Sequence, residues 1–263
     1  MQLEAVLAST AQAWALLAAY PLSWLMVIVV FLVAVEALTF IPYIGFLLKL
    51  AVAGVVGAQL FSLFAGAASG SAPSPLSLLA AFGLPVAAQL TLAFAAALPL
   101  LAGLLYLYLT SGANSLRFFF GNIFKEKPPG PAAFVRFKYV MHLVALPLSL
   151  VVGAVMLTGA SGIAAFAAAV SAAASNWLPV LSLGLLAVVF EGLSVALPKL
   201  LPKTMAIATG ILLLVAFVAW SSAFVYAVST QAWSVQAVGP NPPIERTSSS
   251  TLRVPSAPAH VER

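Results

Sequence analysis

The sequence predicts an all-α protein, a polytopic integral membrane bundle of about six transmembrane helices. Hydrophobic residues make up 63% of the 263 residues and charged residues only 6%, whereas soluble domains average about 45–50% and about 25%. So little polar surface could not cover a globule in water. Apolar runs of about 20 residues, the length that crosses a bilayer, also follow one another along the chain.

The membrane domain covers residues 1–238. We expect spans at about 22–40, 46–67, 86–109, 139–158, 177–197 and 205–228. The apolar run 76–110 is too long for one straight span. Gly83 and Pro85 divide it, because proline disrupts a helix that continues through it.

Three further segments are expected to be interfacial helices, at 3–20, 76–84 and 161–175. Residues 3–20 lack the positively charged start of a signal peptide, and the alternative is that they extend the first span. Residues 161–175 are rich in alanine, and the alternative is a further crossing. We favour an interfacial helix there, because another crossing would spoil the charge pattern described next.

Positive charge falls on one side of this topology. The cations in question are Lys49, Arg117, Lys125, Lys127, Arg136, Lys138, Lys199 and Lys203. The loops 68–76 and 159–176 on the other side contain no charge. Because loops rich in Lys and Arg stay in the cytoplasm, we expect both termini to face outward (N-out/C-out).

The polar loop 111–138 interleaves cations with phenylalanines. Its cations are Arg117, Lys125, Lys127, Arg136 and Lys138. Such a segment suits the anionic inner leaflet of the bilayer, where each cation contributes about 1 kcal/mol. The alternative is a cytoplasmic loop that only sets the orientation. The expected partners are therefore the lipid bilayer and a membrane protein or second copy of the chain, and we do not interpret the charge as nucleic-acid binding.

Glu36, Glu191 and His142 are the candidate functional residues, each inside a different apolar span. The predicted topology places them at similar depth near the cytoplasmic side. Ionisable groups are costly in lipid and commonly functional, so one hypothesis is a proton or ion relay. The other is a polar cluster with only a structural role. The candidate charge partners are Lys49, Lys199 and Lys203.

The two glutamates have similar surroundings in the sequence. Each is followed by a leucine and a hydroxyl residue, and then by a proline (Pro42 or Pro198). A glycine (Gly54 or Gly210) comes twelve residues after each proline. Two hairpins of the same orientation would form a parallel repeat, and chance similarity between two apolar stretches is the alternative.

We expect no enzyme, no cofactor and no metal site. The chain has no Cys, and all six acidic residues are Glu, which excludes an aspartyl dyad or a magnesium-binding Asp. No Gly-rich phosphate loop is present, and Glu36, Glu191 and His142 lack the spacing of known metal motifs. Two functions remain, a small transporter or permease with a membrane-embedded Glu/Glu/His layer, and a noncatalytic scaffold or assembly factor that binds lipid or a partner through loop 111–138.

Residues 239–263 differ from the rest in being rich in Pro and Ser, and we expect them to be disordered. The stretch Asn-Pro-Pro-Ile-Glu-Arg-Thr-Ser-Ser (241–249) resembles the translated read-through of the recombination repeats that flank integron gene cassettes. This resemblance implies a bacterial mobile gene, hence a bacterial inner membrane, and a tail that is incidental to function. A soluble periplasmic tether is the alternative. The body resembles small uncharacterised polytopic families of the Yip type, through Ile-Pro-Tyr-Ile-Gly (41–45) and the spacing of its spans.

Overall fold

The computed structural model describes residues 2–41, 44–120 and 130–236, and these residues form an all-helical bundle. Six of its helices are long and apolar enough to cross a membrane. They are α2 (Pro21–Ala37) with the 3-10 turn η1 (Leu38–Phe40), α3 (Gly45–Ala68), α4 (Val86–Ser111), α6 (Pro131–Leu148) with α7 (Val151–Thr158), α9 (Trp177–Leu200) and α10 (Lys203–Gln236). Helices satisfy their own backbone groups, as the interior of a bilayer requires. The predicted fold class is confirmed.

The fourth span begins at Pro131, eight residues before the predicted start near 139. Proline is favoured in the first helical turn, where its missing N–H is not needed. The polar segment before it is also partly helical, in η3 (Ala113–Leu116) and α5 (Arg117–Phe120). Arg136 and Lys138 therefore belong to α6, which corrects their assignment to a surface loop, while Lys125 and Lys127 lie outside the described residues.

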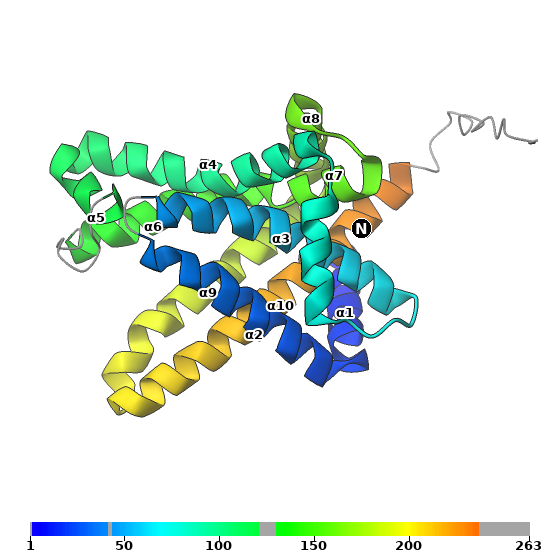
Figure 1. Ribbon diagram of the computed structural model, residues 1–263, viewed down its shortest axis with the longest axis horizontal. Helices are drawn as coiled ribbons and strands as arrows, with labels where there is room; N and C mark the ends of the chain where they lie inside the picture. Colours follow the sequence, from blue (N-terminus) through cyan, green and yellow to red (C-terminus); the bar gives the residue numbers. More distant parts are fainter. Residues whose placement is uncertain (1, 42–43, 121–129, 237–263) are drawn as a thin grey trace, which may run out of the picture.

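The three segments expected at the interface form α1 (Gln2–Ala19), η2 (Pro75–Gly83) and α8 (Gly162–Ser175). Figure 1 shows α1 and α8 at the end of the bundle opposite α5. The backbone of Tyr20, with φ −142° and ψ 60°, is not helical and ends α1 before α2 begins. The 14 residues of α8 are about 21 Å long, short of the roughly 30 Å hydrocarbon core. Neither α1 nor α8 therefore forms or extends a span.

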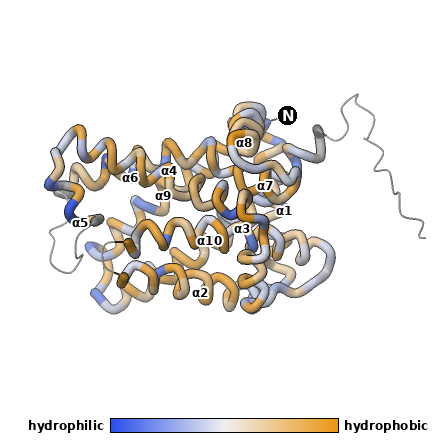
Figure 2. Tube along the Cα trace, turned by 45° about the horizontal axis from the view of Figure 1, so that its top comes forward, coloured by the Kyte–Doolittle hydropathy of each residue, from blue (hydrophilic) through white to orange (hydrophobic). Residues whose placement is uncertain are grey.

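The cations of the described residues gather at the end of the bundle that carries α5. Figure 2 shows hydrophilic positions near both ends and mainly hydrophobic helices between them. The connections at the opposite end, around η2 and α8, are uncharged. This is the charge asymmetry on which the predicted orientation depends.

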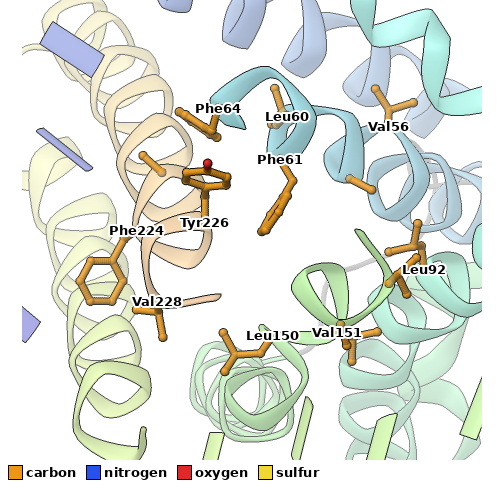
Figure 3. Close-up of a cluster of buried hydrophobic side chains, with 14 of the residues drawn as sticks. Val56, Leu60, Phe61, Phe64, Leu92, Leu150, Val151, Phe224, Tyr226 and Val228 are labelled. Atoms are coloured by element: carbon orange, nitrogen blue, oxygen red, sulfur yellow. The ribbon is translucent and has the colours of Figure 1, made fainter. Parts of the chain in front are cut away.

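Aromatic side chains of α3 form the centre of the core. Figure 3 shows Phe61 and Phe64 beside Tyr226 of α10, with ring centroids 4.9 and 5.9 Å from the tyrosine ring. Trp24 of α2 stacks on Phe64 at 4.1 Å. Each such pair contributes about 0.5–1.5 kcal/mol beyond the burial of its surface, so these rings join α2, α3 and α10.

Glycines allow the helices around this core to approach closely. A Cβ at Gly54 of α3 would lie 2.5 Å from the carbonyl oxygen of Leu92 in α4. A Cβ at Gly103 of α4 would lie 2.7 Å from the ring of Phe137 in α6. Small residues at such contacts are typical of membrane helices, whose association depends on close packing. They set the positions of α3, α4 and α6.

The last helix, α10, extends beyond the length that a bilayer requires. Its 34 residues correspond to about 51 Å, and buried residues are concentrated between Ala223 and Ala232. α1 packs on this part of α10, where the Ser9 hydroxyl donates a hydrogen bond to Gln231 Oε1 at 3.1 Å. The first and last described helices are thus joined at the end opposite α5.

Candidate functional site

The site begins with one face of α6. Lys138, His142 and Ala145 recur at intervals of four and three residues, so they lie on the same side of the helix. Phe137 lies on another side and packs against Gly103 of α4. This contact with α4 turns the polar face of α6 toward α9, against which α6 also packs.

The facing side of α9 carries Glu191, Ala187 and Gly184, spaced by four and three residues. A Cβ at Gly184 would lie 2.7 Å from a methyl group of Leu146 in α6. The two helices run in opposite directions, so Leu146 meets Gly184 and Lys138 meets Glu191. The absence of a side chain at Gly184 therefore allows the close approach that places Glu191 beside α6.

An ion pair with a neighbouring imidazole lies at this crossing. Lys138 Nζ is 2.5 Å from Glu191 Oε2, and the two side chains are 33% and 24% exposed. His142 Nε2 lies 3.8 Å from Glu191 Oε1, and Lys138 Nζ lies 5.3 Å from the centre of the Phe134 ring. Hydrogen bonds between charged groups are stronger than those between neutral groups, so this contact holds α6 against α9. The lysine is further stabilised over the aromatic face.

A cavity of about 360 Å³ adjoins the ion pair. Its walls come from α3, α6, α7, α9 and α10. They are mainly apolar, and the polar lining residues are His142, Ser149, Ser221 and Ser222. Lys138 and Glu191 lie one helical turn beyond His142 and Ala187, which line the cavity. The ring of Phe217, also in the wall, stacks on Phe190 at 4.4 Å. The ion pair and this stack therefore lie beside the cavity on the side of the cation-bearing end.

The cavity begins deep in the bundle. His142 is eleven residues after the start of α6, or about 16 Å at 1.5 Å per residue. Phe217 is fourteen residues after the start of α10, or about 21 Å. Both residues therefore lie well inside helices that are long and apolar enough to cross a membrane.

Glu36 belongs to a different place in the structure. It lies at the end of α2, its side chain is 51% exposed, and Lys49 Nζ is 2.6 Å from its Oε1. The Thr39 hydroxyl lies 3.4 Å from its Oε2. Of the three predicted site residues, the structure thus brings together Glu191 and His142, whereas Glu36 pairs within its own hairpin.

The predicted charge partners are divided in the same way. Lys49 does pair with a glutamate, namely Glu36. Lys199 and Lys203 are exposed where α9 meets α10, and Glu191 pairs with Lys138 instead. The part of the chain that the structure describes contains no group of three His, Cys, Asp or Glu residues that could hold a metal ion.

The similarity between the two glutamate hairpins does not extend to their contacts. Glu36 bonds to the helix that follows it, whereas Glu191 bonds to α6. Pro198 lies within α9, and Pro42 lies outside the described residues. The parallel repeat therefore finds no support in the side-chain contacts.

Sequence reasoning assigned Lys138 to the membrane-surface loop and missed its pairing with Glu191, and it missed the cavity serines. The signal for Lys138 was the spacing of Phe134, Lys138 and His142 after Pro131, which continues a helical pattern through the polar segment. For the serines, the signal was a pair of hydroxyl residues in the middle of the last span, at positions 221 and 222. Both signals required the helix boundaries to be placed correctly first.

Comparison of the chain with protein-family models, with curated proteins and with solved structures found no match. The likenesses to integron repeats and to Yip-type families stay predictions, because no comparison tests them. The predicted disorder of the tail falls on residues that lie outside the described ones. The function is therefore argued from the cavity and the ion pair.

Proposed function

We propose that this chain is a small transporter or permease of a bacterial inner membrane, which opens its central cavity to the two sides in turn. The observation that carries the proposal is the position of the cavity. It lies inside the bundle between apolar helices, as the substrate sites of many transporters do, and an ion pair between two helices lies beside one of its ends.

An ion pair between two helices can hold them together or release them, according to whether its carboxylate is charged. In the closed state, Lys138 and Glu191 neutralise each other inside the bundle. If Glu191 takes up a proton, its charge is lost and the lysine no longer has an ionic partner. His142 lies beside the same carboxylate and lines the cavity. The proposed relay therefore consists of Glu191 and His142, with Lys138 as the opposing charge and without Glu36.

Thiol labelling tests this proposal without knowledge of the substrate. The chain contains no Cys, so Ser222→Cys introduces a single thiol into the cavity wall. We expect a membrane-impermeant maleimide to label it in both right-side-out and inside-out vesicles. Ser229→Cys is the matched control on the same helix, because Ser229 is fully buried against Gly153 and should stay unlabelled.

A scaffold that contacts lipid or a partner through its basic end gives a different result. Its cavity would not open to the two sides in turn, so Ser222→Cys would be labelled from at most one side, and this outcome would refute the transporter proposal. In a transporter, Glu191→Gln should increase the labelling rate from the cytoplasmic side at unchanged expression. Glu36→Gln, which alters the exposed pair, should leave the labelling rate unchanged. The proposal assigns no catalytic step to the chain.

A further inference from the structure

We propose that the central cavity takes small, uncharged, mainly apolar molecules that carry a hydrogen-bond donor, with an aromatic alcohol as the simplest example. This inference rests on the proposed function, because it assigns the substrate class of the same cavity. It is argued from the charge, the hydrogen-bonding groups and the shape of the wall.

The charge of the site favours an uncharged ligand. The described residues that line the cavity include no Asp, Glu, Lys or Arg. The nearest charged groups described, Lys138 and Glu191, offset each other across 2.5 Å. A ligand with a permanent charge would lose its hydration without gaining a counter-ion, and this costs several kcal/mol or more.

Two of the three serine hydroxyls of the wall favour a ligand with a donor. The Ser149 hydroxyl donates its proton to the carbonyl oxygen of Leu146 at 2.7 Å. The Ser221 hydroxyl donates to the carbonyl oxygen of Val218 at 3.3 Å. A serine hydroxyl has one proton and two lone pairs. Both serines have thus used their protons within their own helices, and what they offer to a ligand is an acceptor.

The size and lining of the cavity favour a flat apolar body. Its volume of about 360 Å³ lies at the lower end of the roughly 300–1,000 Å³ typical of small-molecule sites. Phe61 of α3 and Phe217 of α10 supply aromatic surface, and Leu60 and Val225 supply aliphatic surface. Aromatic rings pack favourably on one another, so a ring system with one hydroxyl matches the wall.

Three naphthalenes test these features one at a time. Titration calorimetry would use the full chain in lipid nanodiscs, with the heat of empty nanodiscs subtracted. We expect 1-naphthol to bind about tenfold more tightly than 1-methoxynaphthalene, since the ether lacks the donor. We expect no saturable binding of 1-naphthalenesulfonate, which is charged. Equal affinity for the alcohol and the ether, or preferential binding of the sulfonate, would overturn the assignment.

Variants place the binding in the cavity. The double variant Ser149→Ala/Ser221→Ala should bind the alcohol and the ether equally, while the affinity for the ether is retained. Ser182→Ala is the matched control, because this serine of α9 also donates to its own helix, to Pro179 at 2.7 Å, but does not line the cavity. It should keep the tenfold preference. Loss of the preference in Ser182→Ala, or its survival in the double variant, would place the binding elsewhere.

This binding experiment and the thiol experiment can fail separately. If Ser222→Cys is labelled from both sides but the alcohol and the ether bind equally, the substrate class is wrong and transport still stands. If the alcohol binds through the serines but the thiol is reached from at most one side, the cavity is a binding site and the chain is not a transporter.

Discussion

At Glu191, a lysine and a histidine of α6 meet one carboxylate inside the bundle. At Glu36, a lysine meets a carboxylate that is half exposed at a helix end. Removing one member of a partly buried ion pair destabilises a protein more than removing one member of an exposed pair. The charge that remains is still buried, and it no longer has a partner that offsets the cost of its burial. The two glutamates should therefore differ in their contribution to stability.

We predict that Glu191→Gln lowers the free energy of unfolding by about 1–3 kcal/mol, and that Glu36→Gln lowers it by about 0–1 kcal/mol, as expected for an exposed pair. Unfolding in mixed micelles measures both values. A double-mutant cycle between Lys138 and Glu191 should show a coupling energy. An additive Lys138→Gln/Glu191→Gln variant would show that the 2.5 Å contact contributes nothing to stability.

The sequence was sufficient to select Glu191 and His142, because ionisable residues are rare within apolar spans. It was not sufficient to find their partner. Position along a span gives the depth of a residue, but the direction of its side chain depends on how the helix is rotated. α9 is apolar on nearly all sides, so its sequence contains little information about that rotation. The rotation is set by contacts such as Gly184 with Leu146, which join segments distant in sequence.

At the scale of helices, α3 contains two glycines three residues apart with opposite surroundings. Gly54 faces the backbone of α4, where a Cβ would lie 2.5 Å from the Leu92 oxygen and 2.9 Å from the Ala96 Cβ. A Cβ at Gly57 would meet nothing within 4 Å. The pair thus separates the effect of helix packing from that of helix propensity.

We predict that Gly54→Ala lowers the free energy of unfolding by about 1–3 kcal/mol, because α3 and α4 must move apart. Gly57→Ala should be neutral or stabilising by up to about 1 kcal/mol, since alanine favours the helix. Thermal unfolding of the purified variants measures the difference. Equal effects of the two substitutions would contradict the close α3–α4 contact.

The number of spans was predictable because bilayer thickness fixes the length of an apolar run. The start of α6 was not, because Arg136 and Lys138 look like loop residues when only hydropathy is considered. Within the protein they are tolerated near the helix start, where Lys138 bonds to Glu191 and lies over Phe134. The end of α6 at Leu148 and the start of α7 at Val151 could not be predicted from the sequence either. Pro147 alone does not distinguish a kink from a break in the helix.

At the scale of the whole molecule, the two ends differ in charge. Lys49, Lys199 and Lys203 lie at helix termini on the end that carries α5, and the opposite connections are uncharged. Membrane insertion retains such cationic segments in the cytoplasm. One labelled position at each end of the bundle therefore determines the orientation of the chain in the membrane.

We predict that a single thiol at Ser71→Cys reacts with an impermeant maleimide from the outer side of the membrane, and that Lys199→Cys reacts only from the cytoplasmic side. Both positions are exposed, and the absence of native Cys makes each label unambiguous. Intact cells and inverted vesicles give the two readings. The reverse pattern would show that the charge asymmetry does not determine the orientation of this chain.

The contact between α1 and the far end of α10 has a consequence for biosynthesis. α1 leaves the ribosome well before α10, and chains generally begin to fold from their N-terminal side. Yet the buried side of α1, with Ser9, Ala13 and Leu16, packs largely on α10. That side stays uncovered until the last helix has been inserted. A chain interrupted before α10 would expose it, together with the face of α3 that carries Phe61 and Phe64, and would present to membrane proteases a surface that the finished protein hides.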